Sequence, residues 1–336
     1  MTSEKPLNSY QATVAIVQNL PYGLRMHLAA HSMSFRRLHN RLKFTIKSLK
    51  MQQKREFIDA SSGEWTENPN GILSICTDEN EKSIDYIFVE KNEEEVEILC
   101  SLAPEKSICT EKKDSLRRYF HYFMNTSENA WQHVELEECS KPFGELKNLK
   151  IPSLKWTVNK GMEEEPFANF AEMHVFERLE LINIHLHWLT EQKVKNAAHL
   201  IIRNSEFYYE YEEGNETANM IHFFGSLKNQ LVEAEFRLRW PDTFSMGCDV
   251  LLKNNLKIGS SYTGIFEKRD SLKTEIAASL LKFCENSEET ISKVDGKKHI
   301  VLKTTDDYII AVFENYFGAN LHGFKSFTAL KIANKL

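Results

Sequence analysis

The stretch Val232-Glu233-Ala234-Glu235-Phe236-Arg237-Leu238-Arg239-Trp240 decides the fold class of this chain. Apolar and charged residues alternate along it with the period of two that is typical of a half-buried β-strand. One row of side chains is expected to face a core, while the charged row faces the other way: Glu233, Glu235, Arg237 and Arg239. Such a row is usually a solvated sheet face, and a surface that binds a charged partner is the alternative. Pro241 ends the pattern, because proline cannot donate to a strand ladder.

Shorter stretches of the same character lie on both sides. Apolar runs at 72–76, 84–89 and 96–102 predict a β-meander, with a polar stretch that contains turn signals at 54–71 before it. Further strands are predicted at 42–51, 131–136, 149–156, 182–188, 200–202 and 308–313, and Asp295-Gly296 predicts a hairpin turn between 291–294 and 299–302. Apolar residues at helical spacing predict amphipathic helices at 115–124, 217–227 and 275–284. The sequence therefore predicts an α+β fold.

The spacing of the predicted strands after residue 131 allows a more specific organisation. The strands recur at irregular intervals, and the L-x-x-L-x-L-x-x-N signature of leucine-rich repeats is missing. A degenerate strand–helix array, similar to leucine-rich repeats, remains a hypothesis for this region. The predicted organisation is a short helical segment at 9–51, a mixed strand and helix region at 52–130, and a sheet-rich region at 131–336.

A leucine pattern near the start of the chain predicts a docking element. Pro21 fits the first turn of a helix, and Leu20, Leu24 and Leu28 then fall at i+4 steps on one face. Ser34 can cap a second short helix that carries Phe35, Leu38 and Leu42. Two short helices are too small to fold alone, so they either bind a partner or pack on the downstream sheet.

Composition excludes several classes of function. The chain has 336 residues, of which 42% are hydrophobic, so it can bury a core of about two domains. The formal net charge of -6 argues against a general nucleic-acid binder, and the 13 glycines against phosphate-cradling loops. The N-terminus has no apolar signal region, no stretch reaches the length of a membrane span, and the six cysteines form no C-x-x-C pair. We therefore expect reduced thiols in a cytoplasmic or nuclear protein that does not bind membranes.

Candidate chemistry in the sequence is sparse. His185 and His187 could face the same side of a strand as metal ligands, although an ordinary polar face fits better because no further ligand lies close in sequence. His27 and His31 lack the glutamate of a zinc-protease helix. A basic cluster fits a solvated rim better than a phosphate site: Arg36, Arg37, Arg41, Lys43 and Lys47. No phosphate loop, dinucleotide fingerprint or nucleophile elbow occurs. We therefore expect no catalytic, cofactor-binding or metal site, and no enzyme.

The segment Leu20-Pro21-Tyr22-Gly23-Leu24-Arg25, with Leu28, Phe35 and Leu38, resembles the start of an F-box. The wider layout resembles that of the lineage-expanded F-box and F-box-associated proteins of nematodes. The features that carry this resemblance are spread over most of the chain: Leu42–Leu49, the helix at 115–124, Leu146–Leu154, the helix at 217–229 and the hairpin at 293–298. Residues 29–35 depart from the F-box pattern, so the F-box-like segment is degenerate.

The resemblance implies a non-enzymatic adaptor that recruits substrates to a cullin-RING ubiquitin ligase. Its adaptor-binding residues would fill an apolar groove on the cullin-ligase adaptor protein: Leu20, Pro21, Leu24, Leu28, Phe35 and Leu38. The C-terminal region would then bind an unknown protein target. A stand-alone protein-binding module without a ligase link is the first alternative. The second is an enzyme with a dispersed metal-dependent site around His185 and His187.

Overall fold

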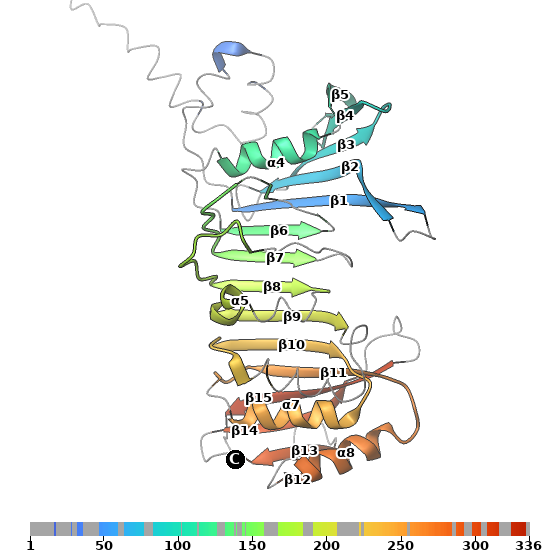
Figure 1. Ribbon diagram of the computed structural model, residues 1–336, viewed down its shortest axis with the longest axis vertical. Coiled ribbons are helices and arrows are strands. Elements are labelled where there is room, and N and C mark those ends of the chain that lie inside the picture. The colour runs from blue at the N-terminus through green and yellow to red at the C-terminus, as the bar shows by residue number, and fades with distance from the viewer. Residues whose placement is uncertain are drawn as a thin grey trace, which may run out of the picture. The chain divides into compact units, whose positions relative to one another are not determined.

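The chain forms two compact units, Met1–Phe143 and Gly144–Leu336. The computed structural model (Figure 1) describes residues 17, 28, 32–35, 47–59, 64–76, 83–101, 103–112, 114–125, 132–137, 139, 143–144, 146–157, 167–183, 191–206, 222, 225–253, 256–283, 287–291, 298–303, 308–315 and 324–333. The predicted adaptor-binding residues Leu20, Pro21, Leu24 and Leu38 lie outside these ranges.

The described strands of the first unit form a mixed sheet in the order β6-β1-β2-β3-β4-β5. Their bounds are β1 Ser48–Asp59, β2 Glu64–Cys76, β3 Ile84–Glu90, β4 Glu95–Cys100, β5 Ala103–Lys112 and β6 His133–Glu137. Strands β1–β5 pair antiparallel with their neighbours in sequence, and β6 pairs parallel with β1. The predicted meander is confirmed, but the polar stretch 54–71 belongs to β1 and β2 apart from residues 60–63, which lie outside the description.

Helix α4 (Ser115–Asn125) packs on this sheet with the apolar face that the sequence predicts. Leu116, Phe120 and Phe123 are buried, and the ring of Tyr119 meets the Phe88 ring of β3 edge-on, with 5.5 Å between ring centroids. Gly71 of β2 allows this close approach, because a Cβ atom there would meet the Leu116 side chain.

The second unit has its own mixed sheet, in the order β12-β13-β14-β15-β11-β10-β9-β8-β7. Its strands are β7 Ser153–Thr157, β8 Arg178–Ile182, β9 His199–Glu206, β10 Leu231–Arg237, β11 Ser261–Glu267, β12 Ser287–Ile291, β13 Lys298–Lys303, β14 Tyr308–Asn315 and β15 Phe324–Ala333. Strands β7–β11 are parallel, whereas β11, β15, β14, β13 and β12 pair antiparallel in turn. Figure 1 shows β7–β11 side by side and pointing the same way.

Helix α7 (Pro241–Lys253) covers one face of this sheet near β11, and helix α8 (Leu272–Phe283) packs beside α7 (Figure 1). The Phe244 ring of α7 stacks on the Tyr262 ring of β11 at 5.2 Å between centroids, and Gly247 leaves room for that ring. Asp242 joins the two helices, because its carboxylate accepts a hydrogen bond from Ser279 Oγ at 2.6 Å. The buried face of β10 and β11 is therefore the face that carries the core.

Several predicted boundaries differ from the structure. Strand β8 begins four residues before the alternation predicted at 182–188 and stops at Ile182, because Asn183 takes the left-handed conformation (φ 58°); residues 184–190 lie outside the description. Pro241 follows β10 as predicted, but it also begins helix α7, which the sequence analysis missed; proline suits the first helical turn. The predicted helix at 217–227 falls mostly on residues outside the described ranges.

The fold is α+β, as predicted. The parallel strands β7–β11 begin at residues 153, 178, 199, 231 and 261, and these unequal intervals leave the similarity to leucine-rich repeats a hypothesis. Within the described ranges, no helix combines the length and the apolar character that a membrane span requires.

Candidate functional site

The parallel strands β7–β10 have two different faces. The first face is apolar and buried, with Trp156, Leu181, Ile202 and Phe236 each no more than 1% exposed. The second face is polar, and the alternation of buried and half-buried residues along β10 follows the pattern of the sequence. The charged side chains on the polar face keep part of their surface exposed, from 16% for Glu180 to 49% for Arg178.

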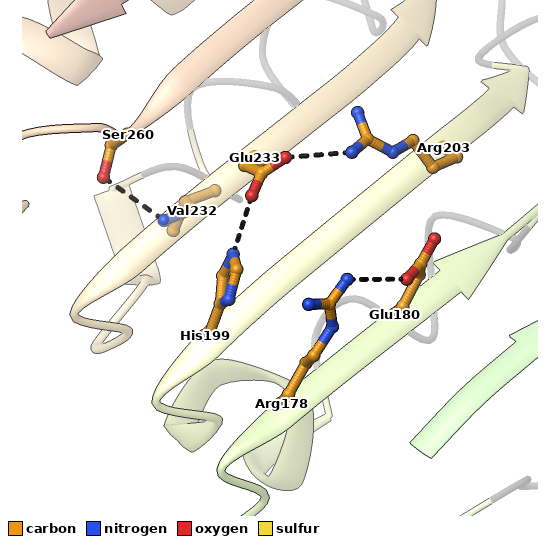
Figure 2. Close-up of polar contacts among 7 residues, drawn as sticks. All are labelled: Arg178, Glu180, His199, Arg203, Val232, Glu233 and Ser260. Atoms are coloured by element: carbon orange, nitrogen blue, oxygen red, sulfur yellow. Dashed lines mark hydrogen bonds and ion pairs between the residues drawn. The ribbon is translucent and has the colours of Figure 1, made fainter. Parts of the chain in front are cut away.

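Five residues on this polar face form the charged row: Arg178 and Glu180 of β8, His199 and Arg203 of β9, and Glu233 of β10. Figure 2 shows their side chains on one side of the three strands. The same view includes Ser260, whose hydroxyl oxygen accepts a hydrogen bond from the backbone N–H of Val232 at 3.2 Å. This bond ties the start of β11 to β10.

Glu233 is the centre of the charged row. One carboxylate oxygen lies 2.9 Å from His199 Nε2, and the other accepts a hydrogen bond from Arg203 Nη2, also at 2.9 Å (Figure 2). The register explains this geometry: Glu233 lies directly across from Ile201 of β9, so the residues two positions before and after Ile201 are its diagonal neighbours. The carboxylate therefore connects two polar side chains of β9 that lie on either side of Ile201.

The rest of the row continues this mixed charge onto β8. Arg178 Nη2 donates a hydrogen bond to the carboxylate of Glu180 at 3.2 Å, two positions along the same strand. Lys155 of β7 lies directly across from Glu180 in the parallel register. Beyond β10 the polar face changes character, because Ile265 of β11 is 3% exposed. The charged row is therefore confined to β8–β10, with Lys155 of β7 next to it.

The charged residues singled out in the sequence along β10 and just after it have separate environments. Glu233 belongs to the charged row, whereas the guanidinium of Arg237 lies over the Phe324 ring, 5.5 Å from its centroid. The guanidinium of Arg239 lies over the exposed ring of Trp240 at 5.1 Å. Both contacts have the geometry of cation–π pairs.

A related arrangement holds Lys50 in the first unit. Its ammonium group lies 2.7 Å from Glu137 and 3.2 Å from Glu135, both on the parallel neighbour β6. Burial alone lowers the pKa of Lys50, but the hydrogen bonds and negative charge of Glu137 and Glu135 outweigh it and raise the pKa above its ordinary value. The cluster stabilises the pairing of β1 with β6.

The other candidates from the sequence are placed only in part. His185, His187, His27 and His31 lie outside the described residues, as do Arg36, Arg37, Arg41 and Lys43 of the basic cluster. Among the residues that are described, no group of three or more histidine, cysteine, aspartate or glutamate side chains could hold a metal ion. Of the predicted adaptor-binding residues, Leu28 and Phe35 are described, and both are helical and half-buried.

The sequence analysis missed most of the charged row. Arg178 and Glu180 lie at alternate positions of β8, and His199 and Arg203 lie on either side of Ile201 on the same face of β9. The period-two signal is present in both strands, but the row forms only when the register aligns segments that are distant in sequence.

Comparison of the chain with protein-family models, with curated proteins and with solved structures found no match.

Proposed function

We propose that this chain is a non-enzymatic protein-interaction protein that recruits a target protein to a cullin-RING ubiquitin ligase. The observation that carries the target-binding part is the two-faced sheet of β7–β10, with a core on one face and the charged row on the other. Rows of mixed charge on a rigid sheet select a partner by complementary charge rather than by buried area. The target would present the opposite order of charges.

The adaptor-binding part of the proposal rests on the resemblance of residues 20–38 to the start of an F-box. Leu20, Leu24 and Leu28 would insert into an apolar groove of the cullin-ligase adaptor protein, with Pro21, Phe35 and Leu38 completing the contact. Such ligases act in the cytoplasm and nucleus, and we propose the same location for this chain. The described cysteines support it, since Cys76, Cys100, Cys139 and Cys248 are thiols.

A pull-down of the purified full chain with the adaptor protein tests the proposal. We expect the wild type to bind and Leu24→Asp to lose binding, because a carboxylate would have to be buried in an apolar groove. Leu281→Asp is the matched control, since Leu281 is 65% exposed on α8 and its substitution should leave binding unchanged. Circular dichroism and thermal unfolding of each variant show whether the fold is kept.

Each outcome decides between the candidate functions. Loss of binding in a folded Leu24→Asp variant, with normal binding by Leu281→Asp, supports the adaptor role. A folded wild type that does not bind the adaptor overturns the ligase link. The stand-alone protein-binding module would then be favoured, because the charged row does not depend on residues 20–38.

A further inference from the structure

The edge of the second unit's sheet where β7–β11 begin is a continuous surface. Backbone hydrogen bonds join the segments that lead into neighbouring strands: Glu177 N–H to Pro152 O at 2.8 Å, Ala198 N–H to Phe176 O at 2.8 Å, Gln230 N–H to Ala198 O at 3.2 Å, and Lys257 N–H to Gln230 O at 2.8 Å. In Figure 1, α5 (Gln192–Asn196) lies at this edge, where β8 and β9 begin. Neighbouring parallel strands are about 4.8 Å apart, so the edge is about 19 Å long.

Lysines gather along this edge, which we call the lysine edge: Lys150 before β7, Lys193 and Lys195 in α5, Lys228 before β10 and Lys257 before β11. They outnumber the glutamates of the same segments, which are Glu172, Glu177 and Glu191. Within the described part of the chain, Lys150, Lys193, Lys195 and Lys228 form no ion pair with a carboxylate. The edge is therefore locally positive on a chain of net charge -6.

His174 shows that these charges act on one another in space. Its Nε2–H donates a hydrogen bond to the backbone oxygen of Ile151 at 2.9 Å, because a carbonyl oxygen can only accept. Burial lowers the pKa of His174, and the positive charges of Lys193 and Lys150 lower it further. The positive charges of lysines from two different segments of the edge thus act on the same histidine.

Exposed apolar side chains lie in the same segments. Met173 is 89% exposed, Val175 is 52% exposed and Ile258 is 54% exposed, all immediately before β8 or β11. Uncovered apolar area of this kind contributes to binding when a partner covers it. The lysine edge therefore combines positive charge with uncovered aliphatic surface.

We propose that the lysine edge binds an extended acidic segment of a partner protein that also carries aliphatic residues. An extended chain rises about 3.3 Å per residue, so about six residues would cross the edge. The acidic residues would pair with the lysines, and the aliphatic residues would cover Met173, Val175 and Ile258. The lysine edge shares no residue with the charged row, and its test does not depend on the ligase link proposed above.

Two other anionic partners fit the surface less well. Single-stranded nucleic acid binds through bases that stack on aromatic side chains, and the exposed large apolar residues of this edge are aliphatic. Peripheral membrane binding uses a long amphipathic helix, whereas the helix at this edge is α5, five residues long. A protein segment needs neither feature.

Fluorescence anisotropy with a labelled peptide, Glu-Leu-Glu-Glu-Leu-Glu, tests the proposal on the full chain. We expect the double variant Lys195→Glu/Lys228→Glu to bind the peptide about tenfold more weakly, or weaker still. Raising the salt concentration from about 50 mM to about 200 mM should also weaken binding of the peptide by the wild type. The matched control is Lys268→Glu/Lys273→Glu, which makes the same change in net charge on exposed lysines away from the edge. Its binding should change less than about twofold.

Further arms separate the partner classes. Met173→Ser should weaken binding of the peptide without altering the salt dependence of that binding, because the substitution removes apolar contact only. The proposal is overturned if the wild type does not bind the peptide, or if both double variants bind it equally. Binding of phosphatidylserine vesicles or a single-stranded oligothymidylate in place of the peptide also overturns it. The adaptor pull-down should be the same for the wild type and for Lys195→Glu/Lys228→Glu, so this test and that of the ligase link fail independently.

Discussion

Replacing Glu233 by alanine tests whether the charged row is a surface feature or part of the core. The substitution removes the carboxylate that contacts His199 Nε2 and Arg203 Nη2, each at 2.9 Å. The side chains of His199, Glu233 and Arg203 are 22%, 30% and 38% exposed, so solvent screens both contacts. Pairs of this kind contribute about 0.2–1 kcal/mol each, and we expect the free energy of unfolding to fall by about 0.5–2 kcal/mol.

Urea unfolding of the purified chain, followed by circular dichroism, measures this change. Glu180→Ala is the matched control on the neighbouring strand, because it removes one ion pair, with Arg178 Nη2 at 3.2 Å. It should cost about half as much as Glu233→Ala. In a double-mutant cycle, Glu233→Ala and Arg203→Ala should show a coupling of about 0.2–1 kcal/mol.

A loss of more than about 3 kcal/mol for Glu233→Ala would refute this reasoning, since only an ion pair withdrawn from water costs that much to break. The row would then be a structural element rather than a surface for a partner. A small loss leaves the variant folded, and Glu233→Ala then becomes a clean tool for measuring target binding.

Two further predictions concern residues of the second unit. Burial holds the pKa of His174 below its unfolded value of about 6.5. The contribution of His174 to stability is therefore fully present above that pH and falls as the pH decreases toward the folded pKa. Urea unfolding at several pH values should show a flatter dependence of the free energy of unfolding on pH for His174→Gln than for the wild type. Gly247→Ala should reduce the free energy of unfolding, because the added Cβ would meet the Tyr262 ring. Overpacking of this kind costs about 1–3 kcal/mol, and the higher helix propensity of alanine offsets about 1 kcal/mol of that cost. Gly225→Ala is the control, with no atom within 4 Å of the added Cβ; equal thermal shifts in the two variants would contradict the packing at Gly247.

Sequence pattern predicted the elements whose structure is local. The alternation along β10, the helical face of α4 and the meander of β2–β4 each appear in a single window of sequence. Each of these segments buries the residues that the pattern marked as apolar, such as Phe236 and Phe120. The period of the apolar residues is sufficient there, because burial on one face sets both the element and its orientation.

Features that depend on pairing between distant segments could not be predicted in this way. Strand β15 pairs with β11, and Thr263 meets Thr328 across that pair with 2.8 Å between hydroxyl oxygens. The two threonines are 65 residues apart, and no local pattern relates them. The same holds for Glu233 and His199, which are 34 residues apart and meet because β9 and β10 align Glu233 with Ile201. The candidate site is a property of register rather than of any motif.

The internal pairing of the charged row constrains how it could bind a target. Glu233 already pairs with His199 and Arg203, and Ile201 beneath them is 1% exposed, so a target must replace contacts that exist. Such an exchange changes the free energy little and mainly sets specificity. Affinity has to come from apolar surface that is exposed before binding, which in the described part of this unit includes Met173, Val175 and Ile258 at the lysine edge. We therefore expect a tightly bound target to contact both the charged row and the lysine edge, which Arg178 at the start of β8 brings together.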